Sequence, residues 1–273
     1  MFQHSRQRTK TATFFSILEL IYHATVRHLR KGHGNAVIGL LSNIMQTLIL
    51  VLVFYILFSV LGMRGSAIRG DFLLYIMSGI FLFMTHSKAM AAVVGAEGPT
   101  SAMMKHAPMN TVVSITSAAL SSLYIQVLSV VVILYVYHVG FTRITIYDPV
   151  GCFAMILLSW FSGVAIGMVF FALKPWAPGF AGIATTIYSR ANMIASGKMF
   201  VANQTPSYIL VLFTWNPLFH CIDQARGFAF KDYTPHHSSV TYPLFVSFAL
   251  IMIGLLGEFY TRKHASLSWS AGR

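Results

Sequence analysis

The residues that could do chemistry are few, and the most regular pattern among them lies shortly before the last apolar stretch. Asn216 is a residue type that caps helices and Pro217 one that begins them, so a helix is expected to start there. On that helix His220, Asp223 and Arg226 are spaced three apart, which makes them neighbours on one face. Such polar pairs suit the rim of an outward cavity, where they could gate it or contact an anionic ligand. They suit a purely structural capped hairpin equally well.

The other reactive residue types form no catalytic or metal-binding pattern. No HExxH sequence and no phosphate-binding P-loop occurs. Cys152 and Cys221 are too far apart in sequence for a metal or redox motif. All seven acidic residues lie outside the predicted membrane spans or at their edges, whereas ion-coupled carriers commonly use carboxylates at mid-depth. We therefore expect no enzyme activity, no metal and no cofactor in this chain, and a pathway whose energy comes from a partner.

The composition indicates that most of the chain is surrounded by lipid. Apolar residues make up 56 % of the 273 residues and charged residues 10 %, with a mean hydropathy of +0.68. The surface of a soluble protein needs roughly a quarter charged residues. The net charge of +12 is spread thinly between apolar runs, without the basic stripe of a nucleic-acid-binding protein. A soluble domain is excluded, and no nucleic-acid partner is expected.

Charge-poor runs predict an all-α integral membrane protein with a single transmembrane domain over residues 1–273. The six predicted transmembrane helices are residues 37–61, 72–94, 111–139, 150–173, 176–200 and 241–257. In the fourth, Gly163 and Gly167 form a small-xxx-small pattern, which lets helix backbones approach closely. The stretch 207–230 is short and interrupted by Asn216-Pro217, which favours a re-entrant hairpin before the last span.

Charge and periodicity orient these elements. Six spans put both termini on one side, and the excess of Lys and Arg in the terminal segments puts that side in the cytoplasm. Residues 13–31 have a helical period with one apolar face and a basic end, which predicts an amphipathic helix lying at the membrane interface. A soluble helix capping the bundle is the alternative for this segment.

The predicted fifth span is less apolar than the others. It contains Tyr188 and Arg190, so we expect it to face protein or water rather than lipid. Arg190 could line a pathway and attract an anionic sugar or phosphate. A partner inside the bundle, or an arginine that reaches to the interface, is an equally good interpretation.

The polar loop 97–110 separates the second and third predicted spans. Pro99 suits the first turn of a short helix and Pro108 its end. Such a helix, carrying Glu97, Lys105 and His106, could dock a cytoplasmic ATPase. An ordinary loop fits the same composition.

Several segments carry a family likeness. Residues 214–226 read TWNPLFHCIDQAR, in which Trp215 opens a Trp-Asn-Pro-Leu signature that is followed by a His and an Arg. This run resembles polysaccharide-export permeases, the membrane subunits of type-2 ABC exporters of capsule and O-antigen, with the capsule branch most similar. The segments at 27–31, 69–79, 109–115 and 260–263 extend the resemblance over nearly the whole chain.

The resemblance implies a homodimer in the bacterial inner membrane, with two P-loop ATPase subunits beneath it that bind ATP and Mg²⁺. The loop 97–110 would engage the ATPase, and the segment of about 207–226 would form an outer gate. The substrate would be a lipid-linked polysaccharide. Residues 97–108 and 117–122 depart from the family pattern, which bears on the substrate rather than on the permease role.

Two other functions remain as alternatives. One is an ABC exporter of another lipid or of a drug, and the other is a stand-alone membrane carrier or membrane enzyme. A gate role for residues 214–226 predicts that Arg226→Ala impairs export in a protein that is still folded.

Overall fold

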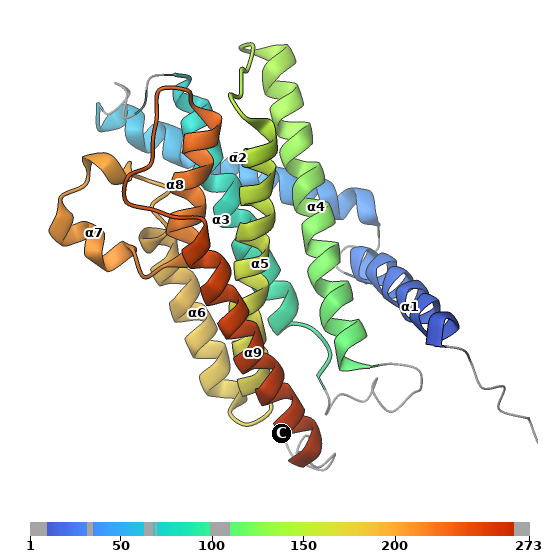
Figure 1. Cartoon of the computed structure of the whole chain (residues 1–273). Helices are drawn as coiled ribbons and strands as arrows, with labels where there is room; N and C mark the ends of the chain where they lie inside the picture. Colours follow the sequence, from blue (N-terminus) through green and yellow to red (C-terminus); the bar gives the residue numbers. More distant parts are fainter. Residues whose placement is uncertain (1–9, 32–34, 63–67, 69, 99–109, 265–273) are drawn as a thin grey trace, which may run out of the picture.

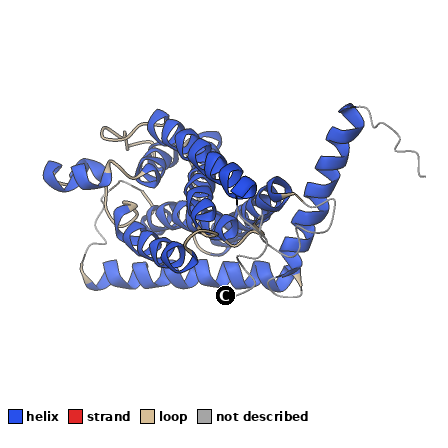
Figure 2. Ribbon diagram, turned by 90° about the horizontal axis from the view of Figure 1, so that it is seen from below, coloured by secondary structure: helices blue, strands red, loops and turns tan. Residues whose placement is uncertain are grey.

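The fold is known from a computed structural model that describes residues 10–31, 35–62, 68, 70–98 and 110–264 (Figure 1). Over these residues it is helical, without a β-strand (Figure 2). The helices are α1 (Lys10–Lys31), α2 (Ala36–Val60), α3 (Phe72–Val94), α4 (Thr111–Gly140), α5 (Pro149–Leu173), α6 (Pro178–Ala195), α7 (Ser207–Phe213), α8 (Pro217–Ala229) and α9 (Thr241–His264), with a 3₁₀ turn, η2, at Ala202–Gln204. The predicted all-α class is confirmed.

Five of the described helices, α2, α3, α4, α5 and α9, are long and apolar enough to cross a membrane. Four of them agree closely with predicted spans, and α9 starts at the predicted Thr241 but continues beyond residue 257 to His264. The predicted span 176–200 contains α6, which has 18 residues and is not among these five. The structure is thus compatible with a multi-pass membrane protein.

Local sequence explains where most of these helices begin. An Asn or Asp before the first turn accepts hydrogen bonds from backbone N–H groups that the helix itself leaves unpaired. These capping residues are Asn35 before α2, Asp71 before α3, Asn110 before α4, Asp148 before α5 and Asn216 before α8. The helices α5 and α8 also start with a proline, which suits a first turn.

The centre of the bundle is α3, which packs against α2, α4, α5 and α8. Two glycines of α5 let it lie close to α3. A Cβ at Gly163 would overlap the carbonyl oxygen of His86, and one at Gly167 would lie 2.9 Å from the carbonyl oxygen of Met90. The small-xxx-small prediction of close approach is therefore confirmed. The Ser159 hydroxyl adds a hydrogen bond of 2.7 Å from α5 to the carbonyl of Leu82 on α3.

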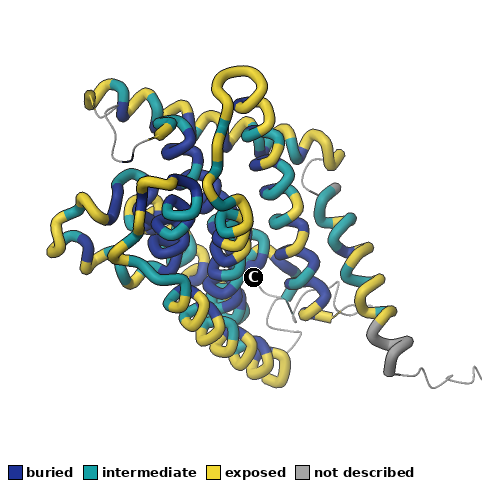
Figure 3. The backbone as a smooth tube through the Cα atoms, turned by 45° about the horizontal axis from the view of Figure 1, so that its top comes forward, coloured by how far each residue is buried: buried dark blue, intermediate teal, exposed yellow. Residues whose placement is uncertain are grey.

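The outer helices present apolar residues outward. Of the apolar window of α3, 78 % is buried inside the bundle, compared with 28 % for α2 and 22 % for α9. Buried residues accordingly gather in the middle of the bundle, and exposed residues follow its outer faces (Figure 3). An apolar outer surface is what a lipid environment requires of a helical protein.

The two N-terminal helices pack against the bundle without running parallel to it. Figures 1 and 2 both show α2 running steeply across α3 and α4 rather than alongside them, and the Asn43 amide fixes the crossing by donating to Ser129 Oγ at 2.8 Å on α4. The predicted interfacial segment 13–31 lies within α1, which packs against α4. Its side chains Phe15, Ile17 and Leu18 are exposed, an apolar surface that a membrane interface would cover.

Candidate functional site

The predicted gate residues lie in the connection between α6 and α9. The stretch 207–230 folds as two short helices, α7 and α8, that are joined by a turn at residues 214–216. In Figure 1, α8 lies above α6, beside the upper parts of α3 and α5, against which it packs. Most of its side chains are buried, so the described structure embeds α8 in the bundle.

Asn216 fastens the start of α8 to the end of α6. Its Oδ1 accepts from the N–H of Leu218 at 3.0 Å, and its Nδ2 donates to Asn192 Oδ1 at 2.6 Å and to the carbonyl of Ala195 at 3.0 Å. The predicted helix start at Asn216 and Pro217 is confirmed. The neighbouring Trp215 lies on the outside of the turn and is 78 % exposed.

Arg226 lies inside the protein, where it is 1 % exposed. Its Nη1 donates to the carbonyls of Gly197 at 3.1 Å and Phe200 at 2.7 Å, and its Nη2 donates to that of Lys198 at 2.8 Å. The guanidinium carbon lies 4.3 Å from the centre of the Tyr75 ring on α3. Arg226 therefore holds the turn after α6 against α8, and in the described structure it does not lie at the rim of a cavity.

The side chains of Asp223 and His220 hold the loop that follows α8. Asp223 accepts from the hydroxyl of Ser238 at 2.7 Å and from that of Tyr233. Burial and the nearby Asp223 carboxylate raise the pKa of Tyr233, so its phenol keeps the proton that it donates. His220 Nε2 donates to the carbonyl of Thr214 at 2.8 Å, and its Nδ1 accepts from the N–H of Ser239 at 3.1 Å, which fixes the neutral tautomer. These contacts favour the structural interpretation of the three-residue spacing.

A second basic residue is buried beside Arg226. Lys198 is 3 % exposed, and its Nζ lies 3.3 Å from the centre of the Phe83 ring and 5.2 Å from that of Phe54. It has no hydrogen-bond acceptor in the described part of the chain. Its described neighbours are thus the faces of these two aromatic rings. It connects the turn after α6 to α3 and to the crossing helix α2.

The two polar residues singled out in the predicted fifth span lie in different environments. Tyr188 is half-buried and its hydroxyl lies 2.9 Å from His86 Nε2, while Arg190 is exposed. His86 is fully buried on α3, with its Nδ1 2.9 Å from Ser162 Oγ on α5. Sequence analysis missed His86, although a lone histidine in a charge-poor span is a signal that points to it.

Arg190 lies on an apolar stripe of α6. The stripe consists of Phe180, Ile183, Ile187 and Ile194, which are all exposed and follow helical spacing. Only Ala181 and Asn192 of this helix are buried. The face of α6 that carries Arg190 is therefore unpartnered in a single copy.

Of the predicted docking residues, Glu97 alone lies in the described structure. It is half-buried at the end of α3, and its backbone N–H donates to Ser114 Oγ at 3.0 Å. Pro99, Lys105, His106 and Pro108 lie outside the described residues. The docking role stays a prediction.

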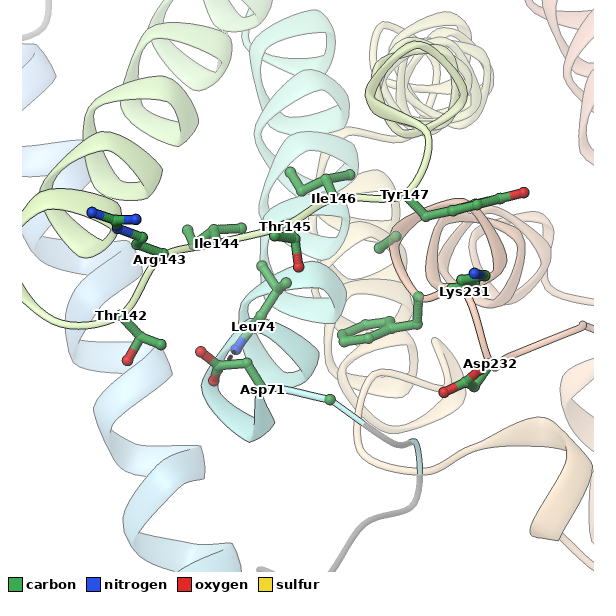
Figure 4. Close-up of a pocket in the computed structure, with 13 residues that line it drawn as sticks. Asp71, Leu74, Thr142, Arg143, Ile144, Thr145, Ile146, Tyr147, Lys231 and Asp232 are labelled. Carbon is green, nitrogen blue, oxygen red and sulfur yellow. Dashed lines mark hydrogen bonds between the residues drawn. The ribbon is translucent and has the colours of Figure 1, made fainter.

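A pocket with charged residues in its lining opens where the far end of α8 meets α3 (Figure 4). We call it the outer pocket, because the sequence predicts that this end faces away from the cytoplasm. It has a volume of about 430 Å³ and is lined by Gly70, Asp71, Leu74 and residues 142–147 and 229–232. Backbone hydrogen bonds from Tyr147 to Ala229 (3.2 Å) and from Asp148 to Phe228 (2.8 Å) hold its walls together.

The described residues contain no cluster of three or more His, Cys, Asp or Glu that could hold a metal ion. They form an apolar helical bundle in which the buried, hydrogen-bonded helix α8 lies between α6 and α9 in the chain. Comparison of the sequence with models of protein families gave no match, and comparison with curated proteins gave none either.

Proposed function

We propose that this chain is the membrane-spanning permease subunit of an ATP-driven ABC exporter that moves lipid-linked capsular or other surface polysaccharide across the bacterial inner membrane. It acts as a homodimer, with cytoplasmic P-loop ATPase subunits that bind ATP and Mg²⁺. The observation that carries the proposal is the helix α8, which starts at Asn216-Pro217 and is fastened inside the bundle between α6 and α9.

The dimensions of α8 fit a re-entrant element. Its 13 residues extend about 20 Å at ~1.5 Å per residue, which is short of the ~30 Å hydrocarbon core. Non-helical backbone at membrane depth is tolerated where protein covers it. Here Arg226 donates hydrogen bonds to three carbonyls of the turn at residues 197–200. The Asn216 amide donates to the carbonyl of Ala195 at the end of α6.

In the proposed six-span arrangement α6 is the fifth span, and α2, which crosses α3 and α4 steeply in a single copy, is the first. The 18 residues of α6 extend about 27 Å, close to the thickness of the hydrocarbon core. Trp176 precedes it, and its indole N–H donates to Thr261 Oγ1 on α9 at 2.7 Å; Trp is common at the membrane interface. With six spans, the basic end of α9 and the N-terminal helix both lie in the cytoplasm.

The pathway in this proposal lies between two copies. Within one copy the core is filled by packed side chains, and the exposed stripe of α6 is the surface that a second copy would face. On that stripe Arg190 would attract the negative charge of a sugar acid or a phosphate linkage. The exposed Trp215 offers an aromatic face to a sugar ring.

The test is purification of the full chain from its native membrane in a mild detergent. A P-loop ATPase should copurify, and Lys105→Ala together with His106→Ala should reduce the ATPase recovered while insertion stays normal. Lys231→Ala, on the opposite side of the membrane, is the control and should leave the complex intact. A chain that purifies without any ATPase, or that moves a solute by itself in vesicles, overturns the proposal.

A further inference from the structure

A second cavity lies on the flank of the bundle, away from the connection between α6 and α9. It is an open groove of about 870 Å³ between α2, the start of α3 and the last turns of α4, and we call it the flank groove. Its walls are mostly aliphatic, with Leu48 and Leu52 on one side and Val132 and Val136 on the other. It exists because α2 crosses α4 steeply and diverges from it (Figures 1 and 2).

The flank groove adjoins the outer pocket. Asp71 and Thr142 line both cavities. At this junction the Tyr137 hydroxyl donates to Asp71 Oδ2 at 2.6 Å. An apolar groove therefore lies next to a pocket that has charged residues in its lining, an arrangement that suits an amphiphile.

The polar end carries charges of both signs. Figure 4 shows Asp71 and Arg143 on one side of the outer pocket and Lys231 and Asp232 on the other. Basic residues on both sides suit a headgroup that carries a phosphate, and the carboxylate of Asp232 suits an ammonium group near Lys231. A ligand with a phosphate-bearing headgroup has partners here that a purely apolar helix would not use.

Aromatic residues mark the level of this junction in the membrane. The rings of Tyr55 and Phe72 lie 6.2 Å apart and those of Tyr137 and Phe141 lie 5.8 Å apart, and all four line the flank groove. Tyrosine is enriched where lipid headgroups meet the hydrocarbon. These rings therefore suit an outer pocket at headgroup depth and a groove that extends into the hydrocarbon.

We propose that the flank groove and the outer pocket together bind one membrane phospholipid. Its acyl chains lie in the flank groove between α2 and α4, and its phosphate-bearing headgroup lies in the outer pocket, between Arg143 and Lys231. The volume of the flank groove falls within the range of about 300–1,000 Å³ that is common for ligand sites. This site requires only the α2–α4 crossing and a membrane, so it does not depend on the proposed export function.

The experiment counts the phospholipid that the full chain retains in detergent, by native mass spectrometry. The purified protein is then titrated with palmitoyl-oleoyl phosphatidylethanolamine and, separately, with glycerol phosphate. We expect one tightly held phospholipid per chain and no comparable binding of glycerol phosphate. Equal binding of the two would mean that the outer pocket is an anion site alone, and would overturn the proposal.

Two exposed valines of α4 provide a matched pair. Val136, 53 % exposed, lines the flank groove, and Val131, 56 % exposed, does not. Val136→Trp should fill the groove and reduce phospholipid affinity at least tenfold, whereas Val131→Trp should leave it unchanged. Equal retention by the two variants would show that the lipid is a non-specific shell. Conversion of a dimer to a monomer by Val136→Trp, with lipid retention intact, would assign the groove to a second copy.

Substitutions that remove positive charge test the proposed headgroup site. Replacing Arg143 and Lys231 together by Ala should weaken phospholipid binding about tenfold, because each basic residue near a lipid phosphate contributes to binding. Replacing Arg262 and Lys263 by Ala at the far end of α9 removes the same charge and should have no effect. Because all four residues are exposed, these variants are expected to fold, and an unchanged affinity in the first would contradict the proposal.

Discussion

At Arg226 a full positive charge is stable inside the protein because its donors reach three main-chain carbonyls and its plane rests on Tyr75. Sequence spacing correctly made Asp223 its neighbour on α8, but the groups that bind it come from a turn some 26 residues earlier. That turn depends on Gly197, whose φ of 74° is one that other residues rarely adopt. Spacing along one helix carries no information about such a partner.

These contacts change what we expect of mutations at Arg226. Arg226→Lys keeps the charge but cannot reach three carbonyls, so at least one buried acceptor loses its donor. The expected loss is about 3 kcal/mol of stability, measured as a lower unfolding temperature of the full chain in detergent.

Arg143→Lys, at an exposed arginine, is the control and should melt like the unmodified protein. A stable Arg226→Ala protein that has lost only export would instead support the gate role expected from the sequence.

At the scale of elements, the sequence predicted the long helices well and the short ones less well. The Asn and Asp residues that precede the apolar runs are caps, so four predicted spans begin within a residue of the helices observed. The predicted span 176–200 is broken after α6, because Gly197 and the carbonyls bound by Arg226 form a turn there. The steep crossing of α2 could not be predicted from the sequence either, since Asn43 and its partners on α4 are far apart in the chain.

The close contact of α3 and α5 can be tested with one methyl group. Gly163→Ala places a Cβ against the carbonyl of His86, and overpacking of this kind costs about 1–3 kcal/mol. We therefore expect a lower unfolding temperature and a weaker α3–α5 contact.

The same change at Gly182, on α6, meets no atom within 4 Å. Gly182→Ala should be neutral or slightly stabilising, because Ala is favoured over Gly in helices by about 1 kcal/mol. If both variants behaved alike, the close packing of α5 on α3 would be contradicted.

For the whole molecule, the alternation of helix directions defines two ends of the bundle. The ends of α3, α5 and α9 lie at one end in Figure 1, and the starts of α3 and α5 lie at the other. The distribution of basic residues predicts that the first of these ends faces the cytoplasm. Composition and charge therefore predict the architecture at this scale, whereas the arrangement of α2 and α8 comes from tertiary contacts.

Cysteine labelling in intact cells tests this orientation. Lys231→Cys lies at the outer pocket and Lys174→Cys follows α5 at the opposite end. A membrane-impermeant maleimide should label Lys231→Cys directly and Lys174→Cys only after the cells are permeabilised.

The unmodified protein is the control, because Cys221 is buried and Cys152 is half-buried. The reverse pattern, or direct labelling of both positions, would refute the predicted orientation.

The hydrogen bonds around His86 have a direction that limits what this histidine can do. Ser162 gives its only hydroxyl proton to the carbonyl of Ser159 at 2.8 Å, so its oxygen accepts from His86 Nδ1, and Nε2 in turn accepts from Tyr188. The series ends on an amide oxygen, which has no proton to release. A proton that entered from α6 could not be passed on from α5. These hydrogen bonds therefore connect three helices and do not form a proton-transfer path.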